Sequence, residues 1–252
     1  MKIRVLSDLH LEFTDNRYID IPEGDVLILA GDVCLAEEVD EYYRFFLQCR
    51  SKYDKVYYVM GNHEHYYSNF KETLQTLRDG IPKGITLLQN QSELYNGVHF
   101  VGATMWTDFR GSGVAIEEAR TYMNDYHLIS GFTPEKAMEE NDNTKEWFGQ
   151  CIPMLKKAPV VMITHHPPSE SSVKGRYTRM TPSYSNNMDK FIRDHPNITA
   201  WVHGHVHHNS DYMINQCRVM SNPMGYTGSE INPEFDVNFE FDVCYNIPDE
   251  YD

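Results

Sequence analysis

Four histidines lie within residues 203–208, directly after an apolar run at 198–202 that is typical of a β-strand. Alternation along an extended chain predicts that the three at odd positions lie on one face, and Gly204 lets the backbone bend so that neighbouring rings converge. Imidazole is the commonest metal ligand in proteins. The cluster alone could equally be a surface tract that binds metal adventitiously. Its meaning therefore depends on whether other segments bring oxygen ligands to it.

Four more segments carry side chains that bind metal ions, and each of them follows a β-type run. The candidates are Asp8 with His10, Asp32, Asn62 with His63, and His165. Nine of the twelve histidines lie in these four segments and the 203–208 cluster, which random scatter would not produce. Binding sites in α/β sheets form beyond the carboxyl ends of the strands. Five such ends in one sheet would bring all of these residues together.

The mixture of donors indicates the kind of metal site. It combines imidazole, carboxylate and amide oxygen without thiolate, which disfavours a closed structural zinc site. Seven candidate ligands are too many for one tetrahedral ion and enough for two open ones. Two divalent ions about 3.5–4 Å apart favour in-line displacement at phosphorus. We therefore expect a shared carboxylate between two ions and a shared hydroxide as the nucleophile.

Short apolar runs must position these residues. We expect strands at residues 2–6, 25–30, 55–60, 86–89, 98–105, 159–164, 198–202, 214–220 and 235–243. Helical periodicity and capping signals predict helices at 37–50, 69–80, from 134 onward and at 188–192. We interpret residues 106–157 as a surface excursion within one domain that covers 1–247. Residues 248–252 are expected to form a loose acidic tail.

Composition excludes several classes of protein. The formal net charge of −15 disfavours duplex nucleic acid and anionic membrane surfaces as partners. The five cysteines are scattered, odd in number and never spaced as C-x-x-C, which fits a reducing cytosol. No run is apolar and long enough to span a bilayer. The chain enters strand-like sequence at Lys2 and shows no apolar region of a signal peptide. We expect a cytoplasmic protein with no membrane partner.

The five motifs together resemble the signature of the calcineurin-like metallophosphoesterases. The matching stretches are Asp8-x-His10, Gly31-Asp32, Gly61-Asn62-His63-Glu64, His165-His166-Pro167 and Gly204-His205-x-His207. Three later stretches, at 106–109, 123–126 and 222–226, are similar to a small bacterial and phage-type branch of that family. The resemblance implies an α/β fold, a four-layer β-sandwich of two mixed sheets flanked by helices.

The resemblance also implies a ligand set for two divalent ions that share Asp32. One ion takes Asp8, His10, Asp32 and His207, and the other takes Asp32, Asn62, His165 and His205. His63 would contact the phosphoryl group or protonate the leaving oxygen. Manganese is the expected metal, with iron, zinc, nickel or cobalt as alternatives, because imidazole with carboxylate suits all of them.

We therefore predict a phosphodiesterase that hydrolyses a small-molecule or nucleotide phosphodiester through a metal-bridging hydroxide, with Asp32 and His63 as catalytic residues. Open alternatives are a phosphomonoesterase (including a protein phosphatase), a single-strand nuclease, and a catalytically silent scaffold. The segment after Asp32 lacks the second aspartate and the arginine of the family's protein phosphatases, which weakens that alternative. Candidate contacts to the substrate are Asn62, Arg176, Arg179 and Tyr226.

Overall fold

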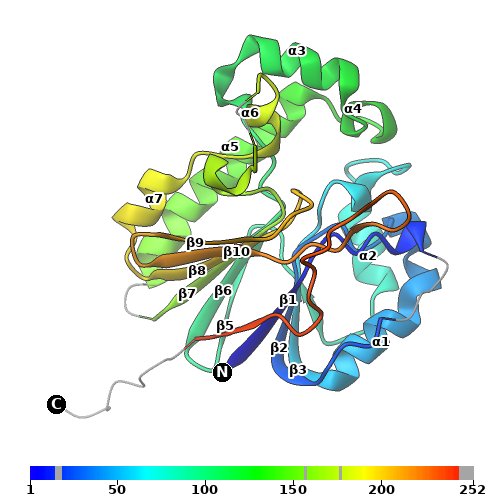
Figure 1. Cartoon of the computed structure of the whole chain (residues 1–252), viewed down its shortest axis with the longest axis vertical. Coiled ribbons are helices and arrows are strands. Elements are labelled where there is room, and N and C mark those ends of the chain that lie inside the picture. The colour runs from blue at the N-terminus through cyan, green and yellow to red at the C-terminus, as the bar shows by residue number, and fades with distance from the viewer. Residues whose placement is uncertain (15–18, 156–157, 176–177, 244–252) are drawn as a thin grey trace.

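Two β-sheets pack face to face and carry helices on both outer faces (Figure 1). The computed structural model describes residues 1–14, 19–155, 158–175 and 178–243. Helix, sheet, sheet and helix form four layers, and each sheet mixes parallel with antiparallel strands. The predicted fold class is confirmed. The predicted tail at 248–252 lies outside the described residues.

The first sheet has the strand order β13-β1-β2-β3-β4, and the second has the order β5-β6-β7-β8-β10-β9. The strands of the first are β1 (Lys2–Leu6), β2 (Gly24–Leu29), β3 (Tyr53–Tyr58), β4 (Ile85–Leu87) and β13 (Glu240–Asp242). Those of the second are β5 (Gln91–Tyr95), β6 (Val98–Ala103), β7 (Val160–Thr164), β8 (Ile198–His203), β9 (Ser210–Ile214) and β10 (Cys217–Ser221). A short hairpin of β11 (Gly225–Tyr226) and β12 (Glu230–Ile231) follows β10.

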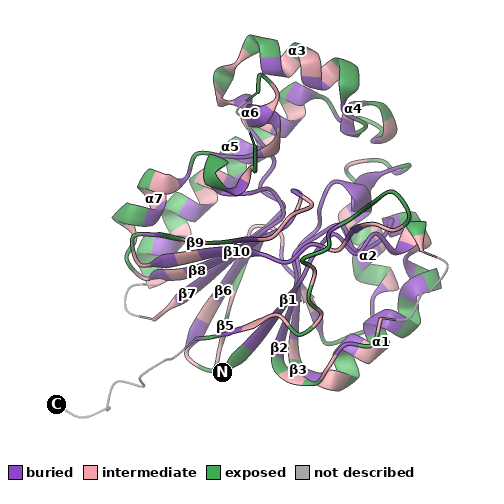
Figure 2. Cartoon of the chain, in the orientation of Figure 1, coloured by how far each residue is buried: buried purple, intermediate pink, exposed green. Residues whose placement is uncertain are grey.

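Alternation along the central strands explains the layers. In β2, Val26 and Ile28 belong to the core between the two sheets. Leu27 and Leu29 face the opposite way, into the core beneath the helices of the first sheet. Because both faces are covered, the central strands are apolar at nearly every position, as is typical of buried parallel strands. Figure 2 shows the same pattern as buried ribbon through the middle of both sheets.

The helices cover the sheets unevenly. Helices α1 (Tyr43–Lys52) and α2 (Thr73–Gly80) pack on the first sheet, and α5 (Pro134–Cys151) and α7 (Asp189–Asp194) pack on the second. Helices α3 (Gly113–Tyr122), α4 (Asp125–Leu128) and α6 (Thr181–Tyr184) stand beyond one end of the sandwich (Figure 1). Short 3-10 turns connect these elements: η1 (Leu11–Phe13), η2 (Ala36–Tyr42), η3 (His63–His65), η4 (Phe109–Gly111), η5 (Ile152–Leu155) and η6 (Glu170–Ser172).

The stretch 106–157 has a buried core of its own. Trp106, Phe109 and Phe132 lie in one apolar cluster that also includes Tyr66 and Leu35 from the loops after β3 and β2. Trp106 is 2% exposed, so it packs in this cluster and is no candidate for stacking on a substrate. The stretch therefore closes the end of the sandwich at which the motif loops emerge.

The long helix α5 begins where the sequence predicts. Thr133 caps it by accepting a hydrogen bond from the backbone N–H of Lys136 at 3.3 Å, and Pro134 is its first residue. The helix continues through Asn141, whose buried amide donates to the Trp106 carbonyl and, at 2.7 Å, to Asn186. These tertiary partners satisfy a side chain that would otherwise favour a helix end.

Several other predicted elements are wrong in detail. The helix expected at 37–50 begins as the 3-10 turn η2 and becomes α-helical only at Tyr43. The capping box expected at Asn69 does not form, because α2 starts at Thr73 and Asn69 accepts from the Lys71 N–H instead. The strand expected at 214–220 is not continuous. It spans the end of β9, a turn at which Asn215 adopts a φ of 53°, and most of β10. Of residues 235–243, 240–242 form a strand.

Candidate metal centre

The predicted metal-ligating residues converge at one end of the sandwich, at the carboxyl ends of five strands. Strands β1, β2 and β3 of the first sheet supply Asp8 and His10, Asp32, and Asn62. Strands β7 and β8 of the second sheet supply His165, and His205 and His207. The expectation that one sheet carries all five ends is wrong. The site lies where the ends of the two sheets meet. For this reason its proposed ligands come from both halves of the chain, from Asp8 to His207.

One group of donors comprises Asp8, His10 and His207. The Nε2 atoms of His10 and His207 lie 3.2 Å apart, and His207 Nε2 lies 3.6 Å from Asp8 Oδ1. His10 and Asp8 are fully buried. A second group comprises Asp32, His165 and His205, with Asn62 among them. Asn62 Oδ1 lies 3.1 Å from both His165 Nε2 and His205 Nδ1.

Asp32 lies between the two groups. Its Oδ1 accepts a hydrogen bond from the backbone N–H of His63 at 2.8 Å, which fixes the carboxylate. Its Oδ2 lies 3.8 Å from His10 Nε2 and 3.3 Å from His165 Nε2. A single carboxylate oxygen therefore faces one imidazole of each group, which is the position that a bridging ligand needs.

The donors fit divalent cations. Among the described residues, the buried atoms Asp8 Oδ2 and His205 Nε2 have no hydrogen-bond partner. Two imidazole nitrogens 3.2 Å apart, as in His10 and His207, match the spacing of ligands that each lie about 2.0–2.1 Å from a common ion. The set of imidazole, carboxylate and amide oxygen suits Mn, Fe, Co, Ni or Zn.

The backbone is strained at the candidate ligands. Asp8, His10, Asp32 and His205 have φ values of 51°, 43°, 52° and 70°, in the left-handed region that non-glycine residues seldom adopt. Strain of this kind gathers at functional sites, where the surrounding fold over-determines it. Gly204 has a different role from the predicted bend, because a Cβ there would lie 2.6 Å from Asp8 Oδ2. It is required for the close approach of β8 to the loop after β1.

Buried charges shift the pKa values of the candidate ligands. Burial alone would raise the pKa of Asp32, but His165, His63 and His10 hold it well below its usual range. Burial lowers the pKa of His165, yet the adjoining Asp32 carboxylate overcomes this and raises it to about 10. Burial and the neighbouring imidazoles of His166 and His165 lower the pKa of His205 far below its usual value. A cation that takes Asp32 and His165 as ligands must displace a proton, so metal uptake releases protons.

Glu64 holds the loops after β2 and β3 together. It is fully buried and accepts hydrogen bonds from the backbone N–H groups of Asp32 (3.0 Å), Val33 (2.8 Å) and Gly61 (2.6 Å). The Tyr58 hydroxyl donates to it at 2.6 Å. Glu64 is the last residue of the motif Gly61-Asn62-His63-Glu64, and its supporting role is visible only in the folded structure.

We expect Glu64→Ala to lower the free energy of unfolding by about 3–5 kcal/mol, because three backbone N–H groups and one hydroxyl lose their acceptor in the core. Urea denaturation followed by circular dichroism measures this. Glu64→Gln keeps an acceptor oxygen and should lose less. An unfolding midpoint unchanged in Glu64→Ala would contradict the supporting role.

Asp125 orients the amide of Asn62. Its Oδ1 accepts from Asn62 Nδ2 at 3.0 Å and from the Tyr66 hydroxyl at 2.7 Å, so the Asn62 oxygen points to His165 and His205. Asp125 is 2% exposed and lies at the start of α4. The resemblance at 123–126 pointed to this stretch without assigning a role to the carboxylate.

We expect Asp125→Ala to weaken Mn²⁺ binding about 10- to 100-fold, because the Asn62 oxygen is no longer held in place. Isothermal titration with Mn²⁺ measures the change. Asp142→Ala, which removes an exposed carboxylate on α5, is the matched control and should bind as the wild type does. Equal affinities in all three proteins would refute the role of Asp125.

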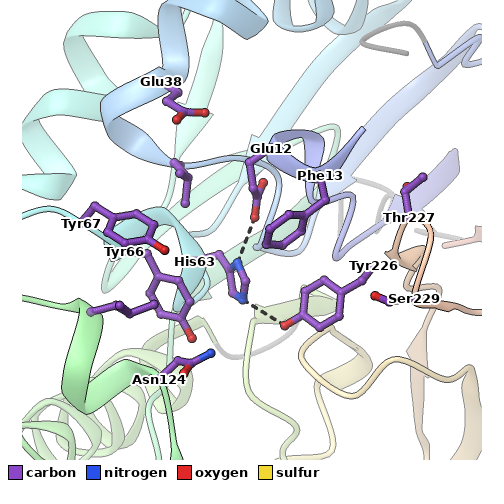
Figure 3. Close-up of a pocket in the computed structure, with 12 residues that line it drawn as sticks. Glu12, Phe13, Glu38, His63, Tyr66, Tyr67, Asn124, Tyr226, Thr227 and Ser229 are labelled. Atoms are coloured by element: carbon purple, nitrogen blue, oxygen red, sulfur yellow. Dashed lines mark hydrogen bonds and ion pairs between the residues drawn. The ribbon is translucent and has the colours of Figure 1, made fainter. Parts of the chain in front are cut away.

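His63 lies beside the donors and belongs to neither of these two groups, although it forms a third cluster of possible donors with His10 and Glu12. Figure 3 shows its ring between Glu12 and Tyr226. Glu12 Oε1 lies 2.9 Å from His63 Nδ1 and 3.2 Å from His10 Nδ1. This carboxylate therefore places an Nδ1–H on each ring and leaves the Nε2 of His10 free to bind a cation. His63 Nε2 lies 3.1 Å from the Tyr226 hydroxyl. Glu12 was not predicted from the sequence, since no local pattern distinguishes it.

Of the predicted substrate contacts, some lie at the candidate metal centre and others do not. Tyr226 and Asn62 line cavities at the site. Arg179 is 80% exposed, lies 4.0 Å from Glu118 and lines neither of these cavities. Arg176 lies outside the described residues. His203, which the alternation placed on the same face as His205 and His207, contacts the Ser172 hydroxyl at 2.8 Å and belongs to neither group of donors.

Comparisons with known proteins identify the family of this chain. The family model of calcineurin-like phosphoesterases matches residues 1–209. The uncharacterized protein L509 of Acanthamoeba polyphaga mimivirus is 30% identical over 266 residues, which cover 91% of this chain and 93% of that protein. The structure of phosphopantetheinyl hydrolase from Mycobacterium tuberculosis superposes with a TM-score of 0.68 at 20% identity and covers 89% of both chains. A dimetal phosphatase from Danio rerio gives a TM-score of 0.52 at 12% identity, over 87% of this chain and 86% of that one. The chain belongs to the calcineurin-like phosphoesterase family, whose members are metal-dependent hydrolases of phosphoric esters.

Proposed function

We propose that the protein is a phosphodiesterase that acts on a small-molecule or nucleotide phosphodiester with two divalent cations. The observation that carries this proposal is a pair of cavities that meet at the candidate metal centre. They share Tyr66, Asn124 and Tyr226 in their walls. A phosphodiester carries two organic groups on one phosphorus, and each cavity offers space for one of them.

The two cavities differ in the part of the site that they reach. The metal-side cavity has a volume of about 440 Å³, and its walls include Asp32, Asn62, His205 and His207. The second cavity has a volume of about 500 Å³ and is reached by His63 but by none of the proposed metal ligands. A phosphoryl group placed at their junction would have the proposed ligands on one side and His63 on the other. A monoester would leave one cavity without an occupant.

The proposed roles of the residues follow from these positions. Bound cations polarise the phosphoryl oxygens and lower the pKa of water. The chain holds the reacting groups in line: Asp125 aims Asn62, and Glu12 aims His63. As a water oxygen bonds to phosphorus, the bond from phosphorus to the leaving oxygen breaks, and His63 Nε2–H gives that oxygen its proton. Burial lowers the pKa of His63, but Asp32 and Glu12 more than compensate and raise it, which favours the protonated ring.

We propose manganese as the working cation and the cytoplasm as the compartment. Mn²⁺ accepts imidazole, carboxylate and amide oxygen together. The described cysteines Cys34, Cys49, Cys151 and Cys217 are free thiols, as a reducing compartment would keep them. Among the described residues, no helix has both the length and the apolar character that crossing a membrane requires.

A matrix of metals against substrates tests the proposed function. Purified protein is stripped of metal, loaded with Mn²⁺, Fe²⁺, Co²⁺, Ni²⁺ or Zn²⁺, and assayed on aryl monoesters, aryl diesters, cyclic nucleotides and single-stranded oligonucleotides. We expect the highest kcat/KM on a diester with Mn²⁺. Preference for a monoester, or tight binding of oligonucleotides that falls steeply with salt, would replace the proposal with one of the alternatives. Protein that takes up no metal and hydrolyses nothing would indicate a scaffold.

A further inference from the structure

We propose that the cavity beside His63 selects the leaving group by charge: it accepts an uncharged or cationic alcohol with an aromatic or alkyl body and rejects an anionic one. This leaving-group pocket is defined by Glu12, Phe13, Glu38, Tyr67 and Tyr226, which surround the ring of His63 (Figure 3). The inference rests on the proposed phosphodiesterase function and names the class of substrate that the same site takes.

The position of His63 identifies this cavity as the one for the leaving group. His63 lines this cavity and not the metal-side one, whereas Asp32, Asn62 and His205 line only the metal-side one. The group that receives a proton from His63 Nε2 must lie against that atom. The departing alcohol therefore occupies the leaving-group pocket, and the group that stays on phosphorus occupies the metal-side cavity.

The walls of the leaving-group pocket are aromatic. Phe13 and Tyr67 line the cavity and are 52% and 69% exposed, which is unusual for such large side chains. The Tyr226 ring lies 5.3 Å from the Phe13 ring, almost perpendicular to it. Leu35 and Leu128 also line the cavity. Such walls remove apolar or aromatic surface from water and offer π faces to a cation.

Apart from His63, whose proton goes to the leaving oxygen, the charged side chains that line the leaving-group pocket are negative. Glu12 and Glu38 line it, and no lysine or arginine does so among the described residues. Glu12 Oε2 is buried without a hydrogen-bond partner, while the other oxygen of that carboxylate contacts His10 and His63. A cationic group in the cavity would be attracted to this carboxylate. A phosphate, sulfonate or carboxylate on the leaving group would instead meet like charge in a partly desolvated space.

The test uses methyl aryl phosphodiesters whose phenols differ in one remote substituent, either trimethylammonio, methyl or sulfonate. Each kcat/KM is divided by the solution hydrolysis rate of the same ester, which removes the difference in leaving-group reactivity. We expect the cationic ester to exceed the anionic one by at least about tenfold with the wild-type protein. Equal corrected values, or a preference for the sulfonate, would overturn the proposal.

Two charge reversals on η2 locate the effect. Glu38→Lys should reduce the corrected cation-to-anion ratio by about tenfold. Asp40→Lys makes the same change on the same turn, at an exposed residue that does not line the cavity, and should leave the ratio as it is. Circular dichroism and thermal unfolding show that each variant is folded. A ratio that falls equally in both variants would mean that the general field of this acidic protein, and not the pocket, selects the substrate.

A binding experiment separates this inference from the proposed function. Benzyltrimethylammonium and benzenesulfonate are titrated into the metal-loaded wild-type protein and into Glu38→Lys, and binding is followed by calorimetry. We expect the wild type to bind the cation and not the sulfonate, and Glu38→Lys to lose that binding. If no phosphodiester is hydrolysed with any metal, the proposed function fails while this titration still tests the pocket. If diesters are hydrolysed and neither probe is distinguished, only the pocket inference fails.

Discussion

Asp32→Ala is expected to remove both metal loading and hydrolysis of a bis-aryl phosphate. The Asp32 carboxylate faces both sets of donors, at 3.8 Å from His10 Nε2 and 3.3 Å from His165 Nε2. Without it, one set of proposed ligands has no carboxylate and the other has only Asp8, so two divalent cations would face a single anionic ligand. Elemental analysis should find less than one metal ion per chain, and the rate should fall to that of the uncatalysed reaction.

The control for this prediction must lose a carboxylate elsewhere. Asp211→Ala removes a carboxylate on the edge strand β9 that pairs with Arg218 at 2.7 Å and is not among the proposed ligands. It should keep both metals and the wild-type rate. Circular dichroism confirms that Asp32→Ala is folded. If that variant kept its metals and the wild-type rate, Asp32 would not be the bridging ligand, and the proposed mechanism would be wrong.

The residues that converge at the site could be predicted from the sequence, but the arrangement of strands in two sheets that brings them together could not. A polar ligand directly after an apolar run is a local pattern, so Asp8, Asp32 and His165 could be found without knowledge of strand order. Whether their strands share a sheet depends on pairing between distant segments, and for this reason the single sheet was a wrong expectation. The turn at Asn215 was missed because the expected strand at 214–220 was drawn through Asn215-Gln216, a polar pair that is itself a turn signal.

Three carboxylates near the site could not be assigned from the sequence for a related physical reason. Glu12, Glu64 and Asp125 act on the site through the groups that they hold: two imidazoles, three backbone N–H groups and one amide. Those partners are fixed only by tertiary packing. A carboxylate that holds a ligand in place has no fixed distance in sequence from that ligand, so no spacing pattern reveals it. Of the three, Glu64 alone lies within one of the five motifs.

His63→Gln is expected to lower kcat by about 10²- to 10⁴-fold while the metal content stays at the wild-type level. His63 Nε2 faces the Tyr226 hydroxyl and the leaving-group pocket, and its ring packs edge-on against that of His10, which Glu12 still holds at Nδ1 in the variant. The backbone N–H that it donates to Asp32 is kept in the variant. Loss of the ring should therefore affect proton transfer to the leaving oxygen and leave the metal ligands intact.

The dependence on the leaving group distinguishes proton donation from a purely positional role of His63. A nitrophenolate departs readily without a proton, so His63→Gln should lose the least with a nitrophenyl ester and progressively more with phenyl and alkyl esters. Tyr226→Phe, which removes only the hydroxyl that lies 3.1 Å from His63 Nε2, should lose less and show no such trend. A loss of equal size across all three esters would mean that His63 orients the phosphoryl group without protonating the leaving oxygen. In that case the leaving alcohol need not lie against His63, and its assignment to the leaving-group pocket would have to rest on the charge preference alone.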